Sequence, residues 1–208
     1  MFENRIDAGE QLAELLDDLD VAPDVVLAIP RGGLPVGRAV ADRLGVPLDV
    51  VVASKVGAPW NPELAIGAVA SDGTAWLNDS LIADLGLSDD DVQQRVDRER
   101  EQAAGKRDRY REGRPPLDLS GKAVLVVDDG VATGATTTAC LRYVRNAGAA
   151  RVILAVPVGP PASVERLRGE ADEVVTVETP PHFGAVGQFY HSFTQVSDEE
   201  AMAYLDGA

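Results

Sequence analysis

VLVVDDGVATGATTTA, the stretch at residues 124–139, decides the fold class. It begins with an apolar, β-branched run typical of a buried strand and continues through two aspartates. A turn rich in glycine and threonine follows, and then the start of a helix. A buried strand that leads directly into a helix predicts one unit of an α/β fold with a parallel sheet.

The rest of the chain repeats this alternation of apolar runs and helical patterns. It predicts a single α/β domain over residues 1–208, with an open parallel sheet of about five strands and helices on both faces. The expected strands are 25–29, 48–53, 123–127, 152–157 and 173–177, and the expected helices are 34–44, 133–147 and 161–167.

Two segments interrupt the alternation. Residues 56–76 are rich in Gly, Pro and Asn, and predict a long mobile loop with a hairpin of 64–70 against 74–77. Residues 88–111 predict a very polar, solvated helix joined by pairs such as Arg95 with Glu99.

The stretch at 124–139 also predicts a ligand. Its strand delivers Asp128 and Asp129 to the carboxyl end of the sheet, where open α/β sheets bind ligands. Two adjacent carboxylates there can accept hydrogen bonds from vicinal hydroxyls, as a ribose presents. Residues 133–137, TGATT, start the helix, where backbone N–H groups and the helix dipole attract a phosphate. Together these groups predict a ribose 5-phosphate site.

Other interpretations of this motif fit less well. Receiver domains of phosphorelays also end a strand in paired aspartates, but no Thr-Gly-x-Thr helix start follows. The motif lacks the Lys-Ser/Thr ending of a nucleotide P-loop and the glycine spacing of a dinucleotide fingerprint. A purely structural turn would leave two adjacent buried aspartates without partners, at a cost in stability.

The same residues resemble the motif that binds 5-phosphoribosyl 1-pyrophosphate (PRPP) in type I phosphoribosyltransferases. The segments PRGG at 30–33, SK at 54–55, GAPWNPELAIGAVASDG at 57–73 and FGAVGQFYHSFTQVSDEE at 183–200 extend the resemblance to a little-characterised bacterial and archaeal subfamily. The resemblance implies a type I phosphoribosyltransferase fold, with a small hood from about 1–20 and 179–196. It implies that PRPP is held by Arg31, Gly32, Gly33, Lys55, Asp128, Asp129, Gly130, Ala132, Thr133, Gly134, Ala135, Thr136 and Thr137.

The resemblance also implies an activity, which is transfer of the phosphoribosyl group to a nitrogen base during nucleotide salvage. Arg31 and Lys55 would be catalytic by neutralising the leaving diphosphate, with Mg²⁺ bound mainly through PRPP and indirectly through Asp128 and Asp129. Phe183 and Tyr190 are candidates for stacking on the base, or alternatively pack under a late loop.

One departure from the family pattern concerns the acceptor. The 6-oxopurine enzymes carry an aspartate where this chain has Ala132, so hypoxanthine and guanine are expected to be poor acceptors. Adenine, a pyrimidine or another nitrogen base is then favoured. A PRPP sensor without catalysis is the main alternative function, and hydrolysis or salvage of another phosphosugar is a weaker one.

Composition limits the partners. With 34 acidic against 19 basic residues and a net charge of −15, the chain is not expected to bind nucleic acid. High-salt adaptation or a GC-rich genome would each explain this acidity. No apolar run is long enough for a membrane helix, the first residues do not resemble a signal peptide, and Cys140 is the only cysteine, so a cytoplasmic protein is expected. The expected partners are PRPP and a small base, with a homodimer as one allowed assembly.

Overall fold

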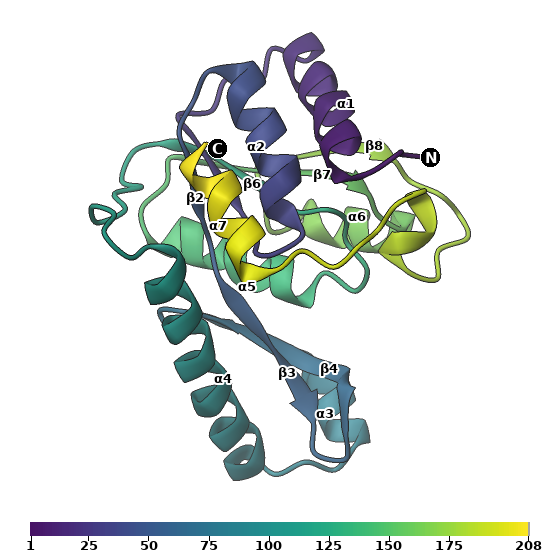
Figure 1. Cartoon of the computed structure of the whole chain (residues 1–208). Helices are drawn as coiled ribbons and strands as arrows, with labels where there is room; N and C mark the ends of the chain where they lie inside the picture. Colours follow the sequence, from purple (N-terminus) through teal and green to yellow (C-terminus); the bar gives the residue numbers. More distant parts are fainter. Residues whose placement is uncertain (208) are drawn as a thin grey trace.

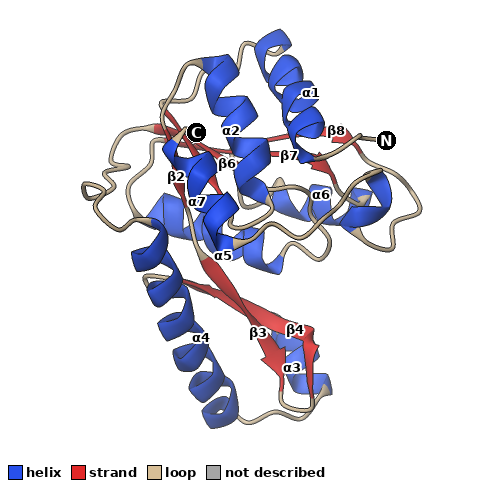
Figure 2. Cartoon of the chain, viewed as in Figure 1, coloured by secondary structure: helices blue, strands red, loops and turns tan. Residues whose placement is uncertain are grey.

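A parallel sheet of five strands in the order β2-β1-β6-β7-β8 forms the centre of the molecule (Figure 2). The structure, a computed structural model, describes residues 1–207. The strands are β1 (Val25–Ala28), β2 (Leu48–Val50), β6 (Ala123–Val127), β7 (Arg151–Val158) and β8 (Glu173–Glu178). The predicted α/β sheet is therefore confirmed, with one difference: the expected strand at 48–53 ends at Val50, and a separate strand begins at Ala53.

Helices cover both faces of the sheet, as Figure 1 shows. One face is covered by α1 (Arg5–Asp18), α2 (Gly33–Leu44) and α7 (Asp198–Asp206), and the other by α5 (Ala135–Asn146) and α6 (Pro161–Leu167). Successive strand residues point to opposite faces, so both sides of each strand must be apolar. In β6, for example, Leu125 and Val127 pack under the first group of helices, and Val124 and Val126 under the second.

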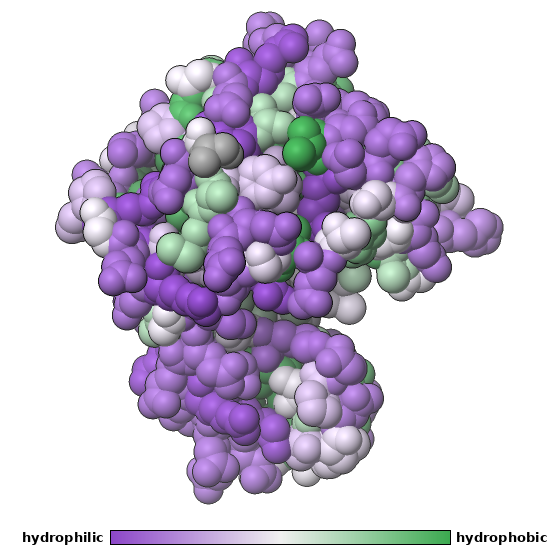
Figure 3. Space-filling view, viewed as in Figure 1, coloured by the Kyte–Doolittle hydropathy of each residue, from purple (hydrophilic) through white to green (hydrophobic). Residues whose placement is uncertain are grey.

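Residues 53–110 leave the sheet and form an extension. It contains the antiparallel strands β3 (Ala53–Ala58), β4 (Asn61–Ala70) and β5 (Ala75–Leu77), followed by α3 (Asp79–Asp84) and α4 (Asp89–Tyr110). In Figure 3 the outline of the molecule narrows between the sheet and the extension.

The predicted long loop at 56–76 is therefore wrong, although the expected pairing of its second half is present as β4 with β5. Strand β3 pairs with β4 along its length because Val56, Ile66 and Val69 share a small apolar cluster. Composition indicated a loop because Gly and Pro, which are frequent in this segment, are uncommon in strands.

The polar helix α4 is present, but it is not simply solvated. Ser88 caps its N-terminus, and Val92, Val96, Ala103 and Tyr110 are buried against the rest of the molecule. The expected pair of Arg95 with Glu99 is not among the ion pairs of residues 1–207. These four apolar residues, spaced one to two turns apart, are enough to hold the helix against the extension and the sheet.

The start of the chain lies against residues 189–192. The amide of Phe2 donates to the carbonyl of Phe189 at 2.8 Å, and the amide of His191 donates to the carbonyl of Phe2 at 2.8 Å. Between β8 and this contact, residues Val186–Phe189 form a short 3-10 helix, η1. No helix among residues 1–207 has the length and apolar character to cross a membrane.

Candidate functional site

The two aspartates lie directly after β6, at the carboxyl edge of the sheet. The amide of Asp129 donates to Oδ1 of Asp128 at 2.8 Å. Burial, and then the negative charge of Asp129, raise the pKa of Asp128 well above its usual range. Negative charges on the two carboxylates repel each other. A ligand that donates hydrogen bonds to both carboxylates would offset this repulsion.

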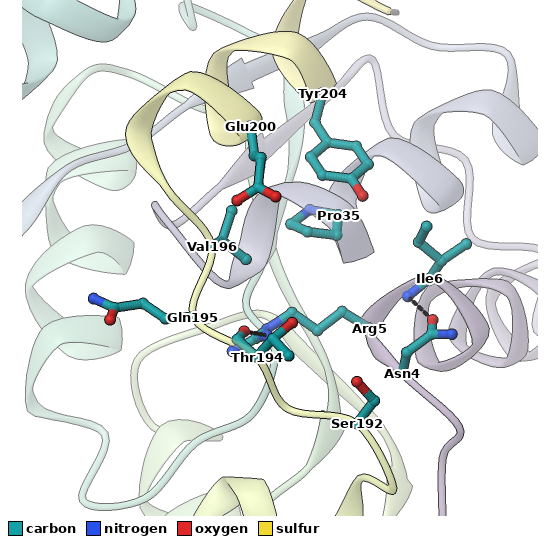
Figure 4. A pocket seen from close by; sticks show the side chains of 10 residues that line it. All are labelled: Asn4, Arg5, Ile6, Pro35, Ser192, Thr194, Gln195, Val196, Glu200 and Tyr204. Atoms are coloured by element: carbon teal, nitrogen blue, oxygen red, sulfur yellow. Dashed lines mark hydrogen bonds between the residues drawn. The ribbon is translucent and has the colours of Figure 1, made fainter.

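Arg5 completes the environment of Asp129, although no local pattern in the sequence indicates it. Its Nε donates to Oδ2 of Asp129 at 2.7 Å, and its Nη1 donates to the carbonyl of Thr194 at 2.7 Å. The guanidinium also lies 3.8 Å from the ring centre of Phe193. Figure 4 shows Arg5 reaching from α1 toward Thr194 in a cavity of about 200 Å³. Burial raises the pKa of Asp129, and the Arg5 guanidinium opposes that rise.

The PRGG segment connects β1 to α2 and touches the aspartates. A Cβ on Gly32 would overlap the carboxylate of Asp129, and one on Gly33 would lie 2.8 Å from the carbonyl oxygen of Val127. Glycine at both positions is therefore required by close approach rather than by an unusual backbone angle. The predicted diphosphate loop and the predicted ribose carboxylates are direct neighbours.

The predicted phosphate cradle surrounds the N-terminus of α5. Gly134 has φ 75°, which glycine adopts without strain, and the helix begins at the next residue. Thr133 is exposed, Thr136 is half-buried and Thr137 is buried, so the three threonines are not equally accessible. Upstream, Gly130 lies so close to Val186 that a Cβ would overlap its side chain.

Lys55 lies on β3, beside the cradle. Together with Ala132, Thr133, Ala135 and Arg166, it lines a cavity of about 660 Å³. Its Nζ forms an ion pair with Oε2 of Glu63 at 3.0 Å. Arg166 of α6, which sequence analysis did not single out, donates to the carbonyl of Thr133.

Arg31 lines a different cavity, of about 510 Å³, and is 3.8 Å from Oδ1 of Asp198. Lys55 does not line this second cavity. Arg31 and Lys55 are both expected to neutralise the leaving diphosphate, and in the structure they line different cavities, with Lys55 beside the cradle.

The two aromatic candidates have different surroundings. Phe183 is half-buried and stacks on Phe189 with ring centres 5.2 Å apart. Tyr190 is buried between Phe2 and Phe193, and its hydroxyl donates to the carbonyl of Asp129 at 2.5 Å. Burial and the nearby Asp129 charge raise the pKa of Tyr190. Its position suits support of the Asp129 backbone better than stacking on a base.

The donor set suits a magnesium ion that arrives with a substrate. Mg²⁺ usually keeps several waters and takes one or two carboxylates plus substrate phosphates. Asp128 and Asp129 supply two carboxylates at one point, and no cluster of three or more His, Cys, Asp or Glu residues suited to a metal occurs within residues 1–207.

Comparison with known proteins gives concordant matches. The family model described as phosphoribosyl transferase domain matches residues 3–194. A protein of Mycobacterium tuberculosis strain CDC 1551, named "Putative phosphoribosyl transferase", is 47% identical over 209 residues, covering 100% of this chain and 47% of the relative. A protein of the same name from strain H37Rv matches equally. This chain thus spans about half the length of those relatives.

Solved structures agree on the fold. A crystal structure of a protein from Thermus thermophilus is 44% identical with a TM-score of 0.83, covering 99% of this chain and 97% of that one. A protein from Aquifex aeolicus shares the fold at 14% identity, with a TM-score of 0.52 over 95% of this chain and 82% of that one.

Proposed function

The chain belongs to the phosphoribosyl transferase domain family, and on that premise we propose that it transfers the 5-phosphoribosyl group of PRPP to a nitrogen base. The observation that carries the proposal is the meeting of three segments at one edge of the sheet. These are the aspartate pair after β6, the N-terminus of α5, and the PRGG connection whose Gly32 touches Asp129.

The roles of the residues follow from their chemistry. Asp128 and Asp129 would accept hydrogen bonds from the two ribose hydroxyls, and the backbone amides and hydroxyls of 133–137 would hold the 5-phosphate. The backbone of 31–33 would hold the diphosphate. Mg²⁺, when bound, would neutralise charge on the diphosphate oxygens.

Transfer then needs no covalent intermediate on the protein. The bond between C1 of the ribose and the diphosphate oxygen breaks, and its electron pair leaves with the diphosphate. The lone pair of the acceptor nitrogen forms the new bond to C1, and the proton on that nitrogen passes to solvent. The protein contributes by positioning the reactants and by stabilising the departing negative charge.

Ala132 bears on the choice of base. It is exposed at the rim of the cavity that also contains Lys55 and Thr133, and its methyl group neither donates nor accepts a hydrogen bond. A site that lacks a hydrogen-bonding partner discriminates against bases that need one. We therefore propose that hypoxanthine and guanine are poor acceptors, and that Phe183 is the better stacking candidate of the two aromatic residues.

The test combines binding with turnover. Saturating PRPP and Mg²⁺, at about 100 times the dissociation constant, should stabilise the fold by about 2.7 kcal/mol, measured as a rise in Tm. Radiolabelled PRPP should then be consumed with one member of a panel of hypoxanthine, guanine, adenine, uracil and orotate. Absence of any Tm shift at millimolar PRPP would contradict the proposal, whereas binding without turnover would favour the sensor.

A further inference from the structure

A second group of cations surrounds the cavity that contains Arg31. This cavity of about 510 Å³ lies between the PRGG connection, the start of β3, the last turn of α4 and the first turn of α7. Three cationic side chains line it, Arg31 from the connection and Lys106 and Arg109 from α4. In a chain of net charge −15 with three lysines, such a gathering of positive charge around one cavity is unexpected.

One carboxylate already occupies this positive environment. Oδ2 of Asp198 accepts from Nη1 of Arg109 at 2.6 Å, and Oδ1 accepts from the hydroxyl of Tyr110 at 2.7 Å. The Nη1 of Arg31 lies 3.8 Å from Oδ1. These contacts and the charge of Lys106 hold the pKa of Asp198 below its usual range. Asp198 therefore marks a position where an anion is stabilised.

The groups around Asp198 are suited to exchange partners. The side chain of Arg109 is 60% exposed and that of Asp198 is 32% exposed. An ion pair this accessible to water contributes little to folding. A ligand with a higher negative charge can compete with a single carboxylate for the same donors, because each charge-assisted hydrogen bond is strengthened by the charge of its acceptor.

We propose that Lys106 and Arg109 of α4 join Arg31 in binding the diphosphate group, with Asp198 as the anion that the diphosphate displaces. The inference rests on the proposed function for the source of the diphosphate, which is PRPP before transfer and inorganic diphosphate after it. It adds two cations of α4 to the residues expected to neutralise the diphosphate, of which Arg31 lines this cavity and Lys55 lines another.

Two further features agree with this assignment. Lys106 and Arg109 are three positions apart, so they lie on one side of α4 and reach the same cavity. Tyr110, which follows them, is buried in the core between α4, α7 and the sheet, and so fixes the end of the helix. The two cations therefore project as exposed side chains from an anchored end of the helix.

The experiment measures the affinities of two probes separately, by calorimetry in the presence of Mg²⁺. Inorganic diphosphate tests this cavity, and ribose 5-phosphate tests the proposed sugar site. Replacing Lys106→Ala together with Arg109→Ala should weaken diphosphate binding by at least about tenfold. Binding of ribose 5-phosphate should stay within about twofold. Arg98→Ala together with Arg100→Ala, two exposed arginines on the same helix that do not line the cavity, removes the same charge and should leave both affinities unchanged.

Asp198→Asn should strengthen diphosphate binding, the reverse of the effect expected for the Lys106/Arg109 variant. It releases the cations from their internal partner, so diphosphate should bind several times more tightly, an effect that a purely structural role for Asp198 would not produce. Circular dichroism checks that each variant is folded. The proposal is overturned if the Lys106/Arg109 variant binds diphosphate as the Arg98/Arg100 variant does, or if Asp198→Asn weakens binding in a folded protein. A wild-type protein that binds diphosphate but not ribose 5-phosphate would contradict the proposed function and leave this site standing.

Discussion

The carboxyl edge of the parallel sheet and the antiparallel extension present their polar groups in different ways. At the sheet edge, Asp128 and Asp129 are half-buried, and Asp129 is fixed by Arg5 at 2.7 Å, with glycine backbone in direct contact. In the extension, Lys55 pairs with Glu63, whose side chain is 89% exposed, and Arg109 pairs with an accessible Asp198. The ion pair of the first region is therefore largely enclosed, whereas those of the second are open to water.

The two regions would therefore recognise a ligand differently, the sheet edge by its geometry and the extension by its charge. Enclosed and hydrogen-bonded groups keep their positions before a ligand arrives, so the sheet edge would select the proposed sugar phosphate by geometry. Exposed cations on long side chains lose their present partners easily and add attraction for an anion of any detailed shape. Substitutions at the sheet edge are therefore expected to change both stability and binding, and those in the extension to change binding alone.

The largest effect is expected from removing both sheet-edge charges. Asp128→Asn together with Asp129→Asn should weaken binding of PRPP with Mg²⁺ by at least about 100-fold, because hydrogen bonds to charged groups contribute roughly 1.5–3 kcal/mol each. Calorimetry measures the loss. Asp89→Asn with Asp90→Asn, at the far end of α4, removes the same charge and should bind normally. Normal binding by the first variant would mean that the sugar lies elsewhere.

The two single variants should differ in stability. Asp129→Asn leaves Arg5 without its carboxylate partner and should lower the free energy of unfolding by roughly 1–3 kcal/mol. Adding Arg5→Ala should recover part of that loss, measured by urea titration of all four members of the cycle. A strictly additive cycle would contradict the importance of the Arg5–Asp129 pair.

Asp128→Asn should raise the free energy of unfolding at neutral pH, whereas Asp129→Asn should lower it. The folded protein holds the pKa of Asp128 above the value of 3.8 for a free side chain, so the folded state binds more protons and loses stability as pH rises between those two values. The variant should therefore unfold at a higher Tm than the parent at pH 7, and the difference should shrink toward pH 4. A variant that is less stable than the parent at pH 7 would show that Asp128 has a structural role.

Lys55→Ala tests the extension. Loss of one phosphate-directed cation should weaken PRPP binding by about tenfold. The exposed pair with Glu63 contributes at most about 1 kcal/mol to folding, so Tm should hardly change. A drop of several degrees in Tm would remove the contrast between the two regions.

The smallest effect is expected for Glu63→Gln. Freed from its carboxylate, Lys55 should bind PRPP a few times more tightly at low salt, and the gain should fade as salt screens the cavity. Binding assays at two ionic strengths measure it. Unchanged affinity at low salt would indicate that Glu63 does not compete with the ligand.

Sequence reasoning succeeded where local patterns carry the information. The apolar run before Asp128, Gly134 at the start of a helix and the repeated strand–helix alternation each act over a few residues, and the sheet follows from them. It failed for Arg5, which meets Asp129 across 124 positions of sequence with no local pattern to announce the contact. It also failed for β3 and its pairing with β4, in a segment whose Gly and Pro content indicated a loop. The cations of α4 gained a proposed role only once the structure placed them beside Asp198.

The extension's separate apolar cluster has a consequence for cooperativity. Val56, Ile66, Val69, Val92 and Val96 form this cluster apart from the two that hold the sheet, and the chain passes from β2 to β3 through two residues only. A unit with its own small core can open by itself at a lower free energy than the whole domain. In such an opened form the aspartates and the phosphate cradle would stay at the edge of the sheet, but the cations of β3 and α4 would move away from it. A ligand that contacts both units would therefore resist local opening of the extension, and part of its binding energy would appear as slower hydrogen exchange in strands it never touches.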